Sequence, residues 1–266
     1  MMLDCIEELG DGFFFVCAGT AMRQLRIQAD LLAKTKVPVL IVGEGGSGKE
    51  TAARLIHKLS GQSPHPIVVI DCFKPFGRLD RELFRLAHGP SLAETGSIRP
   101  ALSTEYQTVV FKNIVRLPPQ TQTQILNYVM NTASRRTADG AAAKRQFRIL
   151  ATCSQSIEMS VGDGSFSREL YAYLSAFTIY IPPLRHRQDE IPFLVSHLMN
   201  QIAWKYGLPP RLLSGAAQFA CQAHSWPGNL KELEDFVKRY LVMGEAAPLA
   251  AEVVTEVPSQ KSTRPN

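Results

Sequence analysis

The chain has 266 residues, a net charge of +5 and a hydrophobic fraction of 45%, values that are ordinary for a globular protein. They exclude a collagen-like, coiled-coil or wholly disordered chain, and no apolar run approaches the ~18 residues of a membrane-spanning helix. The acidic start is unlike a secretory signal, and the five scattered cysteines form no CxxC pair. We therefore expect a cytoplasmic protein with reduced thiols and no membrane partner.

Strand and helix patterns alternate through the first two thirds of the chain. Apolar residues recur at helical spacing over 20–35, and the run 37–42 that follows is typical of a buried parallel strand. The remaining predicted strands and helices are, in order, strands 67–71, 108–111, 147–152 and 177–181 and helices 50–60 and 120–133. This alternation predicts an α/β fold with a mostly parallel sheet.

Three helical patterns follow once the strand signals stop at about residue 188. The first covers 191–202, with the acidic residues 189–190 placed in its first turn, where the helix dipole favours anions. Ser214 is placed to cap the second helix, and Asn229 with Glu232 is placed to cap the third. These patterns predict a small all-α domain after the α/β part.

The chain thus divides into three expected parts. An α/β core covers 1–186, a helical domain covers 187–244, and a tail covers 245–266. The tail is rich in proline and has no periodic apolar face, so we expect it to be disordered. A basic loop within 134–148 could contact nucleic acid or an acidic partner, but a solvated basic hairpin is the favoured interpretation.

A glycine-rich loop joins the strand 37–42 to the helix 50–60, as a phosphate-binding P-loop requires. Its residues are Gly43, Glu44, Gly45, Gly46, Ser47, Gly48 and Lys49. The glycines let backbone N–H groups surround phosphate oxygens, and the lysine adds a full charge. Glu50 stands where Ser or Thr commonly binds Mg²⁺, and Thr51 follows it. A glycine-rich turn without a ligand is the alternative interpretation.

Several segments of the chain resemble one protein family. VLIVGEGGSGKETAARLIHKLSG is similar to the P-loop region of the bacterial enhancer-binding (NtrC-like) proteins, AAA+ ATPases that remodel sigma-54 RNA polymerase and that also carry Glu at the position of Glu50. The resemblance continues through PIVVIDC (66–72), ELF (82–84), FRILATCS (147–154), IPPLRHRQDEIPFLV (181–195) and SWPGNLKELEDFVKRYLVMG (225–244). It spans about 15–244 and implies an AAA+ core followed by a helical lid.

The chain departs from that family at the positions that carry catalysis. After the strand 108–111 the family has Asp-Glu, which hold Mg²⁺ and polarise the attacking water, whereas this chain has Lys112 and Asn113. The exchange introduces a positive charge where two negative ones stood, which is unfavourable for a bound divalent cation. The carboxylate needed to deprotonate water is also missing.

Further departures affect the positions that sense and complete the nucleotide site. Ser154 replaces the sensor asparagine, and Ser167 and Tyr173 match the two arginine-finger positions, with Arg168 one residue out of register. The lid arginine corresponds to Lys231, which keeps the charge and loses the bidentate fork. The segment 85–100, where the family contacts sigma-54, is shorter here and lacks that motif. Asp71 stands where the family has an asparagine.

The sequence therefore predicts a degenerate AAA+ regulatory protein, acting in transcription control, that retains a P-loop for ATP or ADP and has lost hydrolysis. The expected nucleotide-binding residues are 43–51 and Lys231, with Mg²⁺ disfavoured. A subsidiary hypothesis places the Lys112 ammonium in the region of the missing metal, paired with phosphate. The expected partners are proteins, namely AAA+ homologues, copies of this chain or transcription machinery. Sequence-specific DNA binding by this chain alone is not expected.

Two alternatives remain open at this point. One is an active AAA+ ATPase with displaced catalytic residues, in which Arg168 serves as the finger. The other is a scaffold or hetero-oligomer partner that uses no nucleotide and lends its fold to an active homologue. Phosphate release separates the first alternative from the leading interpretation, and copurification with a partner identifies the second.

Overall fold

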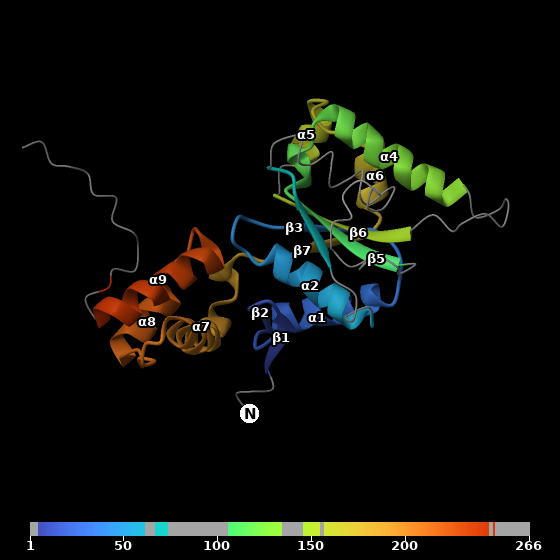
Figure 1. The fold of residues 1–266 in the computed structure, drawn as a ribbon. Helices are drawn as coiled ribbons and strands as arrows, with labels where there is room; N and C mark the ends of the chain where they lie inside the picture. The colour runs from blue at the N-terminus through green and yellow to red at the C-terminus, as the bar shows by residue number, and fades with distance from the viewer. Residues whose placement is uncertain are drawn as a thin grey trace, which may run out of the picture.

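The structure is a computed structural model that describes residues 5–61, 67–73, 106–134, 146–154, 157–244 and 247. It has an α/β core with helices on both faces of a central sheet, and a bundle of three helices beside that core (Figure 1). The expected α/β core with a mostly parallel sheet, followed by an all-α domain, is confirmed.

Five parallel strands form the central sheet. In spatial order they are β4 (Val68–Asp71), β5 (Tyr106–Lys112), β6 (Gln146–Cys153), β3 (Val39–Val42) and β7 (Thr178–Tyr180). Successive side chains of a strand point to opposite faces, and β3 sends Leu40 and Val42 into one hydrophobic cluster and Val39 and Ile41 into another. Both faces are buried, which explains why this strand is a continuous apolar run in the sequence.

Helices cover the two faces of the sheet. On one face lie α1 (Thr20–Ala33) and α2 (Lys49–Leu59), and on the other lie α4 (Pro119–Ser134), α5 (Ile157–Gly162) and α6 (Arg168–Leu174) (Figure 1). Short 3-10 turns occur at Ile114–Arg116, Leu184–His186 and Gln188–Glu190. Because the strands are parallel, the loops after their carboxyl ends meet at one edge, where a ligand of an α/β sheet is expected.

A two-stranded hairpin precedes the core, and the sequence patterns did not predict it. It consists of β1 (Ile6–Gly10) and β2 (Phe13–Val16), which pair antiparallel around a turn whose residues 10–12 all have positive φ. Phe15 packs in the cluster beneath α1 and α2, whereas Val16 packs in the cluster of the helical bundle. The hairpin therefore bridges the core and the lid.

The lid consists of α7 (Ile191–Tyr206), α8 (Gly215–Ala223) and α9 (Asn229–Met243), which share a core around the fully buried Trp226. Ser214 caps α8 as predicted, since its hydroxyl accepts from the Ala217 N–H at 3.1 Å. The prediction for residues 189–190 was wrong, because they lie in a 3-10 turn before α7. The prediction for Asn229 was also wrong, since the cap of α9 is Gly228.

Other predictions fall partly or wholly outside the described residues. Residues 135–145 of the basic loop and, apart from Ala247, the predicted tail 245–266 lie there. Arg148 is no part of a solvated loop, because it is buried and donates to the carbonyls of Leu32 and Val37 at 2.8 and 3.3 Å, near the end of α1. Of the described helices, none has the length and apolar character needed to cross a membrane. The domain boundaries stay predictions.

Candidate functional site

The glycine-rich loop lies at the carboxyl edge of the sheet, between the end of β3 and the start of α2. Gly46 and Gly48 have φ of 70° and 100°, values that side chains rarely allow, so glycine is needed for the shape of the loop. Lys49 turns back over the loop, and its Nζ donates to the carbonyls of Gly43 and Glu44 at 2.9 and 2.6 Å. Burial is the main cause that lowers the pKa of Lys49.

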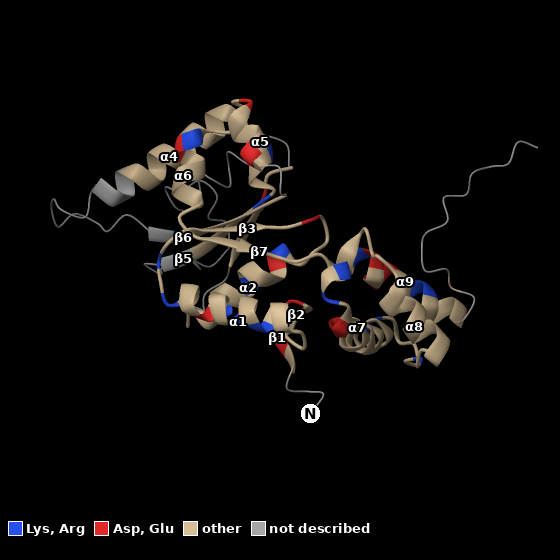
Figure 2. Ribbon diagram, turned by 180° about the vertical axis from the view of Figure 1, so that it is seen from behind, with Lys and Arg blue, Asp and Glu red and all other residues tan. Residues whose placement is uncertain are grey.

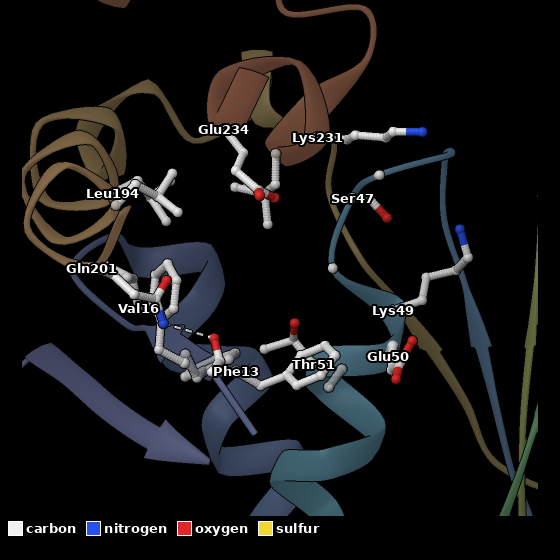
Figure 3. A pocket seen from close by; sticks show the side chains of 18 of the residues that line it. Phe13, Val16, Ser47, Lys49, Glu50, Thr51, Leu194, Gln201, Lys231 and Glu234 are labelled. Atoms are coloured by element: carbon white, nitrogen blue, oxygen red, sulfur yellow. Dashed lines mark hydrogen bonds between the residues drawn. The ribbon is translucent and has the colours of Figure 1, made fainter. Parts of the chain in front are cut away.

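Ser47 and Lys49 lie on the inner side of the loop (Figure 3). Ser47 is fully buried, and among the described residues its Oγ has no hydrogen-bond partner. Buried hydroxyls almost always have a partner, so this atom points to a polar ligand that the described residues do not supply. The loop, the start of α2 and the lysine together fit a phosphate group.

A cavity of about 800 Å³ extends from the loop between the hairpin, α2 and the lid (Figure 3). Residues 45–48 of the loop line one end together with Lys49, Glu50, Thr51 and Lys231. The other end is apolar and is lined by Phe13, Val16, Met22, Leu194, Leu198 and Ile202. Gln201 joins the lid to the hairpin there, since its Nε2 donates to the Gly12 carbonyl at 2.9 Å. The cavity thus has a cationic end and an apolar end, which fits a nucleotide.

The side chain of Glu44 fastens the loop to the lid. Arg185 donates to both of its carboxylate oxygens at 2.6 and 2.9 Å, and the Asn229 Nδ2 donates to Oε2 at 3.1 Å. These hydrogen bonds, the one from Arg185 first, lower the pKa of Glu44 to about 2. Charged residues of both signs lie where the lid meets this loop (Figure 2). Glu44 is therefore a lid contact, rather than a member of the cavity lining.

Two further contacts join the loop backbone to the lid side. The Leu230 N–H donates to the Gly46 carbonyl at 3.0 Å, and Arg187 Nη2 donates to the Ser47 carbonyl at 2.7 Å. Arg187 is buried beside Glu190, with Nη1 at 3.5 Å from Oε2. The loop is thus held from outside by residues 184–230, which leaves its inner face to the cavity.

Lys112 occupies the position where the family resemblance places an aspartate. It is the last residue of β5, and its Nζ lies 2.8 Å from Oε2 of Glu50, whose Oε1 accepts from Arg54 at 3.2 Å. Asn113 follows in the left-handed conformation, with its N–H donating to Thr152 Oγ1 at 3.2 Å. Both residues line the cavity.

These residues do not fit a divalent cation. Magnesium prefers carboxylate and other oxygen ligands, and Glu50, the carboxylate that lines the cavity directly after the loop, already pairs with two cations. Among the described residues no group of three His, Cys, Asp or Glu side chains could hold a metal ion. An ammonium at Lys112 would repel such an ion.

The other altered positions do not line the cavity. Ser154 is exposed directly after β6, and Asp71 ends β4 and accepts from the Phe73 N–H at 3.1 Å. Ser167 caps α6 by accepting from the Leu170 N–H at 3.2 Å. Tyr173 is half-buried against the core, and this burial raises its pKa. Arg168, the displaced candidate finger, is exposed at the start of α6.

Sequence reasoning missed the residues that approach the loop from elsewhere in the chain. Arg185, Arg187 and Asn229 hold the loop, and the hairpin closes the apolar end of the cavity. The hairpin had a local signal, since Asp11-Gly12 directly before the apolar run 13–16 is typical of a tight turn. The contacts of the arginines and of Asn229 had no local signal, because their partners lie at least 140 residues away in the sequence.

Comparison with known proteins places the chain in a family. A profile of the Sigma-54 interaction domain matches residues 15–180, and a profile of the AAA+ ATPase lid domain matches residues 185–265. The chain is 30% identical over 256 residues to the nitrogen assimilation regulatory protein NtrX of Azorhizobium caulinodans, covering 95% of this chain and 56% of NtrX. It is 32% identical to the response regulator protein PilR of Pseudomonas aeruginosa, covering 84% of this chain and 51% of PilR.

Solved structures agree with these matches. The structure is similar to NtrX of Brucella abortus in complex with ATP, with a TM-score of 0.71 and 30% identity over 86% of this chain and 52% of that one. The complex of the same protein with ADP gives a TM-score of 0.74 and 28% identity over 94% of this chain and 57% of that one. The chain spans about half the length of the curated relatives it matches. It belongs to the Sigma-54 interaction domain family, with an AAA+ ATPase lid domain after that domain.

Proposed function

We propose that this chain is the AAA+ part of a transcription regulator that binds adenine nucleotide as a regulatory ligand and hydrolyses it weakly or not at all. The observation that carries the proposal is the pairing of Lys112 with Glu50 beside a P-loop of intact shape. A loop that binds phosphate needs glycines, a helix start and a lysine, all of which are present. Hydrolysis also needs a group that activates water, and the carboxylate for that role is absent at the two positions that carry Lys112 and Asn113.

Nucleotide binding is supported by the cavity and by relatives. The inner face of residues 45–51 would hold the phosphates, Lys231 would reach them from α9, and the apolar end near Phe13 would take the base. NtrX of Brucella abortus, which is 30% identical, has been crystallised with ATP and with ADP. When bound, the nucleotide would contact the core, the hairpin and the lid together, so its presence would set the position of the lid.

The structural positions of the altered residues support the loss of ATP hydrolysis. In the family that the chain resembles, the metal, the base and the arginine finger act together, and such groups are strongly non-additive. Here the two positions at the strand end carry Lys112 and Asn113, and Ser167 caps a helix instead of reaching a nucleotide. Because such groups act as a unit, the absence of any one of them would remove most of the hydrolysis.

Regulation of transcription is supported by the named functions of the relatives. NtrX and PilR are described as regulators, and the XylR protein of Pseudomonas putida, 31% identical over 91% of this chain, is a transcriptional regulatory protein. We propose that this chain acts through protein contacts in the cytoplasm, with AAA+ relatives, copies of itself or the sigma-54 machinery, and with a core at 1–186 and a lid at 187–244. The segment 85–100, where the family contacts sigma-54, lies outside the described residues.

Calorimetric titration with ADP tests the proposal. The native chain should bind ADP, and Lys49→Ala should weaken binding by about tenfold to a hundredfold, the range for loss of a charge-assisted hydrogen bond. Lys34→Ala removes a lysine that pairs with Asp30 on the exposed side of α1, and it serves as the matched control with unchanged affinity. No binding of ADP, or equal binding by the Lys49 variant, would contradict a nucleotide site at this loop.

A further inference from the structure

The cavity carries more positive than negative charge. Its described lining includes six lysine and arginine side chains but three carboxylates, those of Asp11, Glu50 and Glu234. Each of these carboxylates already has a cationic partner: Asp11 has Arg54 at 3.1 Å, Glu50 has Lys112 at 2.8 Å, and Glu234 has Lys238 at 2.8 Å. The described lining thus offers an anionic ligand a cationic site whose three carboxylates are each paired with a lysine or arginine.

Lys112 stands close enough to Lys49 for the two charges to interact. Burial is the main cause that lowers the pKa of Lys49, and the positive charge of Lys112 lowers it further. Both side chains line the same cavity, one from the end of β5 and the other from the start of α2. Two ammonium groups held beside one phosphate-binding loop are stabilised by a ligand with several negative charges.

The ion pair that holds Lys112 can be exchanged. Glu50 lies in the first turn of α2 and keeps a second partner, since Arg54 contacts its other oxygen at 3.2 Å. When Lys112 turns from Glu50 to another anion, the carboxylate therefore remains paired. The side chain of Lys112 is one third exposed and lies at the cavity surface, so this movement needs no repacking of the core.

We propose that Lys112 replaces the divalent cation at this site, so that the chain binds the phosphates of a nucleoside diphosphate or triphosphate without magnesium. The inference rests on the proposed function, since it requires a nucleotide at the loop. The ammonium would donate to phosphate oxygens and neutralise their charge. Magnesium already bound to the phosphates would meet a like charge at Lys112, and the complex would carry less negative charge to attract the lysines.

Calorimetric titration of the native chain with ADP, in magnesium and in EDTA, tests the inference directly. We expect the affinity in EDTA to equal or exceed the affinity in magnesium. A loss of affinity in EDTA would overturn the inference and leave the proposed function standing, because the nucleotide would still bind. No binding in either buffer would overturn both.

Variants at Lys112 test whether this side chain is responsible for ADP binding without magnesium. In EDTA, Lys112→Met should weaken ADP binding by about tenfold or more, the size of a lost charge-assisted hydrogen bond, whereas the exposed control Lys34→Met should bind like the native chain. Lys112→Asp should bind ADP more tightly in magnesium than in EDTA, because it returns a carboxylate to the strand end. Equal affinities of Lys112→Met and the native chain, at matched melting temperatures, would contradict a role for this lysine.

A variant at Glu50 should change ADP affinity in the opposite direction from the Lys112 variant. Glu50→Gln removes the carboxylate that competes for Lys112, so in EDTA it should bind ADP at least as tightly as the native chain. A metal ligand at this position would behave differently, since its loss would weaken binding in magnesium. Weaker binding by Glu50→Gln in EDTA would refute the exchange of Lys112 between the carboxylate and the phosphates.

Discussion

Asn229 is the residue through which the lid holds the phosphate loop. It is fully buried, its Oδ1 accepts from the Leu184 N–H at 2.7 Å, and its Nδ2 donates to Glu44 and to the Gly45 carbonyl at 3.1 and 3.0 Å. Its φ of 56° lies in the left-handed region, which asparagine adopts more readily than most residues. This one side chain joins the start of α9 to the turn at Leu184 and to the phosphate loop, so its amide cannot be replaced without loss of these hydrogen bonds.

We predict that Asn229→Ala lowers the free energy of unfolding by about 2–4 kcal/mol, because it leaves the Leu184 N–H and the Gly45 carbonyl without their partner. Urea denaturation measures the change. The exposed Asn127 on α4 provides the control, since its replacement by alanine should change stability by about 0.5 kcal/mol or less. A loss of the same size in both variants would show that Asn229 has no special structural role.

Glu190 predicts a dependence of stability on pH. It is fully buried, and burial raises its pKa from 4.5 to about 7, although Arg187 and the Gly19 N–H partly oppose the shift. The folded protein then holds a proton that the unfolded chain has released, so stability falls as pH rises from about 4.5 to about 7. Relative to Glu190→Gln, the native chain should lose up to about 3 kcal/mol across that window.

Urea denaturation of the native chain and of Glu190→Gln, at several pH values in that window, measures the difference. The glutamine keeps the size of the protonated acid and cannot ionise, so it isolates this one group. A difference between the two proteins that stays constant with pH would mean that Glu190 does not change its charge there.

At the scale of elements, the loop between β3 and α2 packs against the start of α9. A Cβ added to Gly46 would lie 2.4 Å from the Gly228 carbonyl oxygen, and the φ of Gly46 is 70°. A Cβ added to the neighbouring Gly45 would meet nothing within 4 Å. The two adjacent glycines therefore differ in how closely the lid approaches them.

We predict that Gly46→Ala destabilises the chain by about 2 kcal/mol or more and weakens ADP binding, because the alanine is strained and displaces the lid from the loop. Gly45→Ala should be close to neutral in stability. Denaturation and ADP titration of the two variants provide the comparison. Equal behaviour of both would show that the lid does not rest on Gly46.

The elements that the sequence predicted are those with strong local patterns. The run 37–42 is apolar throughout because both faces of β3 are buried, and the glycine spacing of the P-loop is local, so both were predictable. The strand β1 was missed because its sequence IEELG is largely polar and lacks a regular alternation of apolar and polar residues.

The missing part of the site comes from contacts distant in sequence. Glu44 was identified as a loop residue, but its partner Arg185 is 141 residues away. Lys112 was recognised as a departure from the family and Glu50 as a feature of it. Their ion pair, however, depends on β5 ending beside α2. Asparagine is a common helix-capping residue, but in the fold the side-chain amide of Asn229 donates to the Gly45 carbonyl of the loop instead. Local propensity does not determine such tertiary pairings.

At the scale of the whole molecule, one cavity is shared by the hairpin, the core and the lid. A ligand in this cavity would touch all three, so it would stabilise one arrangement of the lid over others. We propose that the nucleotide acts as a ligand that holds this arrangement and that its hydrolysis supplies no work. This separates the chain from an active ATPase with displaced residues.

The fate of bound ATP tests that claim most directly. The chain is loaded with ATP in the presence of magnesium and then freed of excess nucleotide. Bound ATP and ADP are measured over many times the interval of about 1 s that one turnover of an ordinary slow enzyme takes. The account predicts that the bound nucleotide remains ATP. Conversion to ADP at a rate approaching that of ordinary enzymes, lost in Lys49→Ala, would contradict it.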